Sequence, residues 1–132
     1  MRGLDTNVLV RYLAADDEKQ LAAADRLMAQ CRRRQEQLFV PVLVVCEAVW
    51  VLESRYEQTK AAIVAALEQV LSTSLFVVEE EELIRQSLEA YSRGKGDFAD
   101  YVISGTSARN GCRDTVTFDR ALRGEPAFTI LG

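Results

Sequence analysis

The sequence predicts an α/β fold, with a central parallel sheet of four to five short strands and helices on both of its faces. Short apolar runs alternate along the chain with longer segments whose apolar residues repeat at helical spacing. Strands that alternate with helices form a parallel sheet, because each helix carries the chain back to the same edge. A length of 132 residues is enough for one hydrophobic core, so we expect a single domain over residues 1–132.

The first part of the chain predicts a strand and two helices. The run "GLDTNVLV", residues 3–10, begins as a strand and should turn into a helix near Thr6. Asp16 and Asp17 predict the start of the second helix, because acidic residues are favoured in a first turn. Arginines at residues 32–34 predict its end, where positive charge complements the helix dipole.

The middle of the chain holds an apolar stretch, residues 38–52, in which strand and helix signals compete. Its β-branched residues favour a strand, but the stretch is too long for one typical strand. Pro41 divides it, because proline is favoured at the start of a helix. We therefore expect a strand at residues 38–40 and a largely buried helix at residues 42–56.

The remaining elements follow from apolar periodicity and from turn signals. Asn110-Gly111, for example, is a typical end of a helix. The expected elements are a helix at residues 59–71, a strand at 75–78, helices at 79–93 and 97–109, a strand at 115–118, a short helical turn at 119–123 and a strand at 127–131.

The absence of histidine from the sequence excludes several common enzyme classes. Ser-His-Asp and Cys-His nucleophiles, the usual zinc enzymes and histidine-based acid–base catalysis all need that residue. Cys31, Cys46 and Cys112 are odd in number and widely separated, so they indicate neither disulfides nor a zinc site. We expect buried or half-buried thiols, and we expect carboxylates to be the catalytic groups of an enzyme with this composition.

Composition and charge also bear on where the protein acts and on what. No apolar stretch reaches the ~20 residues of a membrane-spanning helix, and no signal-peptide pattern opens the chain, so we expect a cytoplasmic protein with no membrane contact. The net charge of −4 is unfavourable for binding nucleic acid. However, the basic residues are 13 Arg against 3 Lys, and the planar guanidinium suits phosphate. Four acids gathered around a cation would account for the whole net charge.

Four carboxylates are expected at strand ends or helix starts and a fifth inside a helix, and each has an ordinary structural interpretation. Asp5 in Asp-Thr-Asn and Asp119 in Thr-Phe-Asp-Arg are good helix-capping residues. Asp97 and Asp100 suit the N-cap and third positions of a helix, where acids favour the dipole. Glu47 interrupts an apolar helix, where a charged residue either needs a partner or lies on an exposed stripe.

Taken together, the same acids predict a metal site. Ligands bind at the carboxyl ends of parallel strands, and Asp5 and Asp119 follow the first and fourth strands. Clustered carboxylates repel one another, and a hard divalent cation removes that repulsion. Oxygen ligands suit Mg²⁺ or Mn²⁺, and such a site orients water in phosphoryl transfer.

Three stretches of the chain resemble the PIN-domain ribonucleases, in particular the VapC-type toxins of bacterial toxin–antitoxin pairs. They are "LDTNVLVRYL" near the start, "PVLVVCEAVWVLE" in the middle and "DFADYVISGTSARNGCRDTVTFDRAL" near the end. These stretches occur in the family's order and span essentially the whole chain. The resemblance implies a PIN-like three-layer α/β/α fold, endonucleolytic cleavage of RNA with Mg²⁺ or Mn²⁺, homodimers, and inhibition by a small antitoxin protein.

The resemblance also implies roles for the residues that match the family's motifs. The acidic quartet falls on Asp5, Glu47, Asp100 and Asp119, and the supporting polar residues fall on Thr6, Asn7 and Thr117. Asp97 is either an accessory metal ligand or a helix cap, because Asp100 fits the phase of the family's third acid better.

These roles predict hydrolysis of a phosphodiester bond at an acidic metal site. Asp5, Asp100 and Asp119 would hold one or two cations, some of them through water, and Glu47 would complete the pocket and position the attacking water. Surface arginines are usually only solvated, but some would contact RNA phosphate. The candidates are Arg11, Arg109, Arg113 and Arg120.

Other functions compete with this interpretation. A phosphorelay receiver domain needs a lysine after a late strand, and the last lysine of this chain is Lys95. A haloacid-dehalogenase-type phosphatase needs Asp-x-Asp after the first strand, where this chain has Asp-Thr-Asn. A non-catalytic binding module would leave the repulsion among its acids uncompensated. An RNA-processing nuclease would use the same residues as a toxin, and a small antitoxin gene immediately upstream would favour the toxin.

Overall fold

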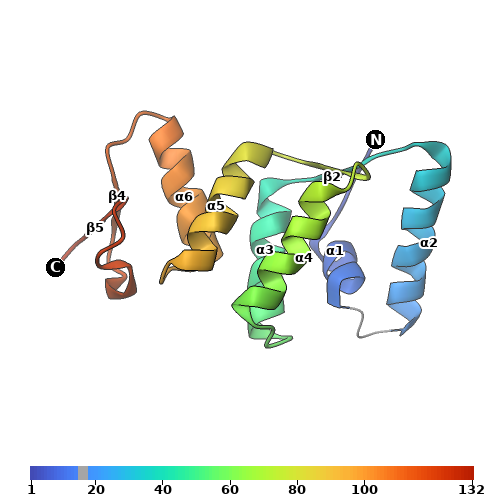
Figure 1. Ribbon diagram of the computed structural model, residues 1–132, viewed down its shortest axis with the longest axis horizontal. Helices are drawn as coiled ribbons and strands as arrows, with labels where there is room; N and C mark the ends of the chain where they lie inside the picture. The colour runs from blue at the N-terminus through green and yellow to red at the C-terminus, as the bar shows by residue number, and fades with distance from the viewer. Residues whose placement is uncertain (15–17) are drawn as a thin grey trace. The chain divides into compact units, whose positions relative to one another are not determined.

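The computed structural model describes residues 1–14 and 18–132, which form two compact units. The first unit comprises Met1–Glu81 and the second comprises Glu82–Gly132. Figure 1 shows the helices and strands of each unit. The predicted helix start at Asp16 and Asp17 lies outside the described residues.

The first unit combines a parallel sheet with two described helices between each pair of successive strands in the sequence. Its described elements are β1 (Arg2–Gly3), α1 (Thr6–Ala14), α2 (Glu18–Arg34), β2 (Leu38–Val40), α3 (Val42–Ser54), α4 (Lys60–Ser72) and β3 (Phe76–Val78). The strands are hydrogen-bonded in the order β1-β2-β3, and Leu38 lies opposite both Arg2 and Phe76. Because all three strands run in one direction, their carboxyl ends share one edge.

Leucine and other apolar side chains fill the interior of the first unit. The buried residues of α1, α3 and α4 fall on one face of each helix, so each helix turns one side inward. The most deeply buried include Leu9, Met28, Leu38, Val40, Leu52, Ile63 and Leu67. The strands whose carboxyl ends form this sheet edge are therefore packed against a buried apolar core.

The longest described helix, α2, has 17 residues and ends at the predicted arginines. It buries Ala24, Met28 and Cys31, and it carries three arginines in its last turn. None of the described helices combines the length and the apolar character that crossing a lipid bilayer would need.

The start of α3 confirms the prediction that a helix follows Pro41. Pro41 takes the N-cap position with φ −62°, and its side chain accepts no hydrogen bond. The acceptor comes instead from Glu79, whose Oε1 accepts a hydrogen bond from Val42 N at 2.9 Å. Glu79 therefore links the end of β3 to the start of α3.

The second unit pairs two helices with a small parallel sheet. Its described elements are α5 (Glu81–Arg93, beginning at the unit boundary), α6 (Phe98–Arg109), β4 (Thr115–Thr117), the 3₁₀ helix η1 (Arg120–Leu122) and β5 (Phe128–Ile130). β4 pairs with β5 in parallel, with Thr115 opposite Phe128. Tyr91 of α5 meets Phe98 of α6 edge to face, with ring centroids 5.9 Å apart.

The α/β class and the parallel direction of the strands are confirmed. The five described strands lie in a three-stranded sheet and a two-stranded sheet, one in each unit. Each strand has only two or three residues. Strands this short carry few ladder hydrogen bonds, so their partners depend on surrounding packing more than on their own sequence.

Helix α5 begins at Glu81 and not at residue 79 as predicted. Glu79 N still donates to Val40 O at 2.9 Å, as a continuation of the sheet pairing. Glu80 then takes φ +50°, a left-handed conformation that ends the extended segment before the helix starts.

The N-cap of α4 provides a test of local stability. Thr59 Oγ1 accepts a hydrogen bond from Ala62 N at 3.2 Å. Thr59→Ala should lower the free energy of unfolding by about 1 kcal/mol, measured by urea denaturation, because a helix N–H loses its acceptor. Thr59→Ser keeps the hydroxyl and is the matched control. An equal loss of stability in both variants would contradict the capping role.

Candidate functional site

The first candidate carboxylate follows β1, at the carboxyl edge of the three-stranded sheet. The sheet pairing continues through Leu4, whose N–H donates to Phe39 O at 2.9 Å. Asp5 is exposed, and its Oδ1 accepts a hydrogen bond from Thr6 N at 2.8 Å. The Asp5 carbonyl accepts from Leu9 N at 3.3 Å, so Asp5 also begins α1. Asp5 is therefore both a helix-capping residue and an acid at the sheet edge.

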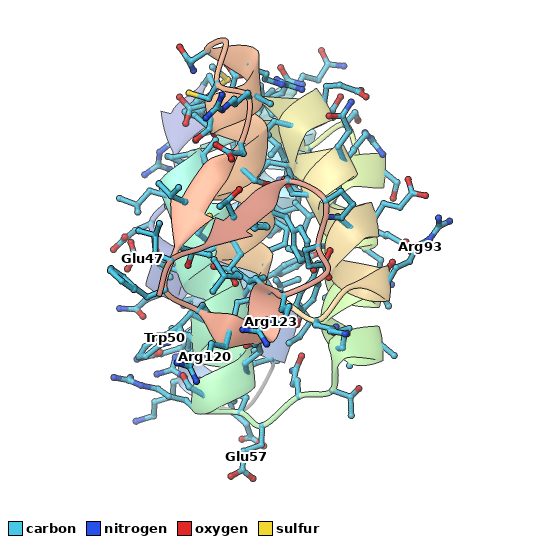
Figure 2. All side chains as sticks on the ribbon, turned by 90° about the vertical axis from the view of Figure 1, so that its left-hand side faces the viewer. Glu47, Trp50, Glu57, Arg93, Arg120 and Arg123 are labelled. Atoms are coloured by element: carbon cyan, nitrogen blue, oxygen red, sulfur yellow. The ribbon has the colours of Figure 1, made fainter. Side chains whose placement is uncertain are left out.

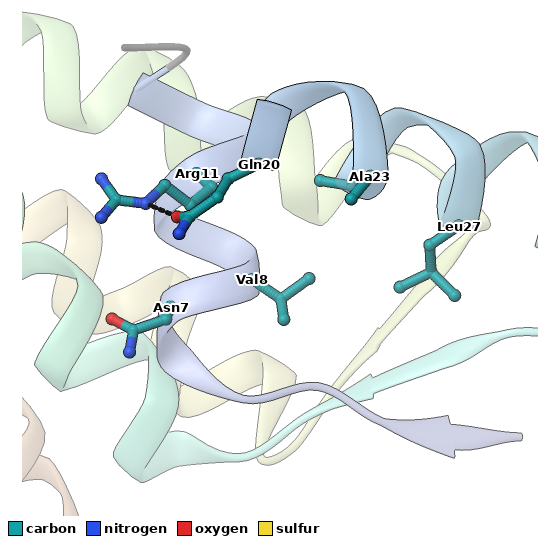
Figure 3. Close-up of a pocket in the computed structure, with 7 residues that line it drawn as sticks. Asn7, Val8, Arg11, Gln20, Ala23 and Leu27 are labelled. Atoms are coloured by element: carbon teal, nitrogen blue, oxygen red, sulfur yellow. Dashed lines mark hydrogen bonds between the residues drawn. The ribbon is translucent and has the colours of Figure 1, made fainter. Parts of the chain in front are cut away.

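The two polar residues after Asp5 differ in exposure. Thr6 is only 7% exposed, whereas Asn7 is exposed on α1. Asn7 lines a groove of about 330 Å³ between α1 and α2, shown in Figure 3. The other residues of this groove are Val8, Arg11, Gln20, Ala23, Ala24 and Leu27. Of the two polar residues, Asn7 is thus the one that a ligand can reach.

Arg11, a candidate for RNA contact, is engaged inside the first unit. Its Nε donates to Gln20 Oε1 on α2 (Figure 3). Its Nη1 donates to the hydroxyl of Tyr56. These bonds tie α1 to α2 and to the segment after α3. A phosphate at Arg11 would compete with them, whereas Arg113 and Arg120 are exposed on the second unit.

Glu47 lies on an exposed face of α3. The residues that α3 buries are Val44, Val45, Ala48, Val49 and Leu52. Glu47 and Trp50 project from the same side of this helix in Figure 2, and Trp50 is 63% exposed. The sequence left open whether Glu47 is buried with a partner or lies on an exposed stripe. Within the first unit, Glu47 lies on an exposed stripe.

The second group of acids begins at α6. Asp97 is the N-cap residue of this helix, and Asp100 lies in its first turn. Asp100 Oδ2 accepts a hydrogen bond from Asp97 N at 2.8 Å. Asp97 is exposed, and Asp100 is half-buried. The structure therefore gives Asp97 the position of a helix cap.

Asp119 occupies the turn after β4. Its N–H donates to Thr117 Oγ1 at 3.0 Å, and its Oδ1 accepts from Ala121 N at 2.9 Å. The first bond shows how Thr117 supports the turn. The second makes Asp119 the N-cap of η1.

The carboxylates of the second unit act on one another through their charges. Burial raises the pKa of Asp100, the hydrogen bond from Asp97 N lowers it, and the negative charges of Asp97 and Asp119 raise it again. Repulsion of this kind accompanies carboxylates that share a neighbourhood.

The candidate donors fit a hard divalent cation in their chemistry, since all are carboxylate oxygens. A cation would also relieve the repulsion at Asp100. The acids are divided between the two units, with Asp5 and Glu47 in the first and Asp97, Asp100 and Asp119 in the second. Within the second unit, the charges of Asp97 and Asp119 act on Asp100. Within each unit, the described residues include no set of three or more Asp, Glu or Cys side chains placed to hold a metal ion.

One of the three cysteines corrects the sequence-based expectation. Cys31 is buried and Cys46 is half-buried, as expected, and burial raises the pKa of the Cys46 thiol. Cys112 is exposed, because it follows the turn at Gly111, where α6 has already ended and φ is +87°.

Two residues near the acids were not singled out from the sequence. Tyr101 and Glu125 form hydrogen bonds with the turn that precedes Asp97. The sequence carries one signal of this contact, the Gly-Lys-Gly segment at residues 94–96, whose glycines allow a close approach.

The chain is similar to known proteins over most of its length. Residues 4–124 match the family model of the PIN domain. A VapC ribonuclease of Aquifex aeolicus (strain VF5) is 32% identical over 123 residues, which cover 93% of this chain and 90% of the relative. The crystal structure of Mycobacterium tuberculosis VapC20, a sarcin-ricin loop cleaving toxin, matches with 20% identity and a TM-score of 0.46, over 94% of this chain and 95% of that one.

The raised pKa of Asp100 predicts a pH-dependent stability. The folded protein binds the Asp100 proton more tightly than the unfolded chain does, so ionisation of Asp100 opposes folding. This cost is absent below the unfolded pKa of about 3.9 and complete above the folded pKa. The melting temperature of Asp100→Asn, relative to wild type in EDTA, should therefore be higher at about pH 7 than at about pH 3.5.

The matched control is Asp25→Asn, which removes an exposed carboxylate of α2. Its melting temperature relative to wild type should not rise over the same pH range. An unchanged difference for Asp100→Asn between the two pH values would contradict the raised pKa of Asp100, which burial causes first and the charges of Asp97 and Asp119 increase.

Proposed function

Because the chain belongs to the PIN domain family, we propose that it is a Mg²⁺- or Mn²⁺-dependent endoribonuclease that acts as the toxin of a type II toxin–antitoxin pair. The similarity to a VapC ribonuclease along most of both chains carries this proposal. The family match includes residues of both units, which supports a single functional domain.

The proposed catalytic site consists of Asp5, Glu47, Asp100 and Asp119, acting together. Asp5 and Asp119 cap the starts of helices, and Asp100 lies in the first turn of α6. A backbone N–H orients one oxygen of each. Asp5, Asp100 and Asp119 are the proposed cation ligands. A bound divalent cation would stabilise the negative charge that develops on the phosphate and lower the pKa of a nearby water.

The other residues of the proposed site orient the attacking water or support the residues that bind the cation. Glu47 orients the attacking water, a role that suits its exposed place on α3. Thr117 supports Asp119 through the hydrogen bond from Asp119 N. Asn7 is the exposed polar residue of α1 that lies two positions after Asp5. Asp97 caps α6, with an accessory contact to the cation as a second role.

The proposed substrate is RNA, and its phosphates would meet guanidinium groups. Arg113 and Arg120 are exposed in the same unit as Asp119, and arginine binds phosphate through two parallel N–H groups. Arg11 is a weaker candidate, because it already bonds to Gln20 and Tyr56.

The toxin role implies specific partners. We propose a homodimer and a small antitoxin protein that inhibits cleavage, and we propose that the protein acts in the cytoplasm. Expression of the wild-type chain alone should arrest growth of a bacterial host, and co-expression of a small protein encoded immediately upstream should relieve the arrest. Normal growth beside strong RNA cleavage in vitro would favour an RNA-processing nuclease instead.

The direct test of the catalytic site is Asp5→Asn. Loss of the charge removes a proposed cation ligand, while the amide oxygen still accepts from Thr6 N, so the fold should remain intact. Cleavage of a mixed RNA panel should require Mg²⁺ or Mn²⁺, should stop in EDTA, and should fall at least about 100-fold in this variant. Gel analysis of the RNA fragments measures the rate, and circular dichroism checks the fold.

Asp25→Asn is again the matched control, since it removes one exposed carboxylate from the same unit. It should cleave at the wild-type rate. An Asp5→Asn protein as active as wild type would overturn the proposed site.

A further inference from the structure

A hydrogen-bonded network joins the turn before Asp97 to the loop after η1. Glu125 Oε1 accepts two hydrogen bonds, one from Lys95 N at 2.9 Å and one from the hydroxyl of Tyr101 at 3.0 Å. The same hydroxyl accepts a hydrogen bond from Gly96 N at 3.0 Å. We call these four residues, Lys95, Gly96, Tyr101 and Glu125, the Glu125 clasp.

The clasp is closely packed as well as hydrogen-bonded. Tyr101 is only 7% exposed, so its hydroxyl makes these bonds largely out of contact with water. A Cβ atom at Gly94 would lie 1.8 Å from the Tyr101 hydroxyl oxygen, and one at Gly96 would lie 2.6 Å from Leu122 Cδ2. The turn at residues 94–96 therefore lies directly against the ring of Tyr101 and the end of η1.

The clasp joins two chain segments, and each segment leads to one of the proposed cation ligands. On one side, Gly96 is followed at once by Asp97, whose N–H holds the carboxylate of Asp100. On the other side, successive turns connect Asp119 to Glu125, because Leu122 N donates to Asp119 O at 3.2 Å and Glu125 N donates to Leu122 O at 3.0 Å.

We infer that Glu125, acting through Tyr101, is a positioning residue that sets the place of Asp100 relative to Asp119. The inference rests on the proposed function, in which both acids hold the cation. Residues that orient metal ligands through hydrogen bonds commonly affect metal affinity by about 10- to 100-fold when they are changed. The Glu125 carboxylate acts by accepting hydrogen bonds, so its charge is not the essential property.

The test measures Mn²⁺ affinity by calorimetric titration of the full chain. Tyr101→Phe keeps the buried ring but removes the hydroxyl, and Glu125→Ala removes the acceptor. Each variant should weaken Mn²⁺ binding by about 10-fold. Glu125→Gln keeps an acceptor oxygen and should recover most of the affinity. The double variant Tyr101→Phe/Glu125→Ala should be no weaker than either single variant, because both changes break one network.

Two controls separate the clasp from general effects. Glu89→Ala removes an exposed negative charge from the same unit, where Glu89 pairs with Arg93 at 3.0 Å. Tyr12→Phe removes a tyrosine hydroxyl from α1, in the other unit. Both should bind Mn²⁺ with wild-type affinity. Hydrogen exchange should also be faster at the Lys95 and Gly96 amides in Tyr101→Phe, independently of metal.

The outcomes distinguish the inference from the proposed function. If Asp100→Asn loses Mn²⁺ binding but Tyr101→Phe binds like wild type, the inference fails and the proposed function stands. The inference also fails if Glu125→Gln is as weak as Glu125→Ala, because charge and not the hydrogen bonds would then matter. If wild type and Asp100→Asn bind Mn²⁺ equally, the proposed metal site fails, and the inference fails with it.

Discussion

A hydrogen bond from a backbone N–H group to one carboxylate oxygen is the interaction on which the candidate site depends. It recurs at Asp5, Asp100 and Asp119, each at the start of a helix. Helix starts leave N–H groups without partners inside the helix, so an acid placed there is both stabilised and oriented. The sequence presents capping and metal binding as alternatives, but one oxygen can cap while the other faces a ligand. The two roles are therefore compatible at the same residue.

The order and type of the elements were largely predictable, because the packing of each helix repeats along its own sequence. In α4, the apolar residues Ile63, Leu67, Val70 and Leu71 recur at helical spacing in the sequence, and all four are buried. In α3, length and Pro41 decided correctly against a strand. The division of the strands between two sheets was not predictable. A strand such as β4, Thr115–Thr117, carries too few residues to specify its neighbours.

The acids of the candidate site could be singled out from the sequence, and so could Thr6 and Thr117 beside them, whereas contacts between distant segments could not. Acids at strand ends stand out locally, because a carboxylate interrupts an apolar pattern. The bond from Val42 N to Glu79 spans 37 residues, and the bond from Lys95 N to Glu125 spans 30. Such contacts depend on how distant segments pack, and they leave no periodic signal. The sequence could not decide whether Glu47 is exposed, because a helix rich in apolar residues shows little difference between its faces.

The close approach of residues 94–96 to the Tyr101 ring limits how this segment can evolve. A side chain at Gly94 would overlap the tyrosine hydroxyl, so mutation of the glycine is tolerated only after the tyrosine has become smaller. Gly96 is restricted in the same way by Leu122. Related sequences should therefore change these positions as a group. Sequences that keep Tyr101 should keep both glycines. Sequences that lose Tyr101 should no longer need glycine at residue 94.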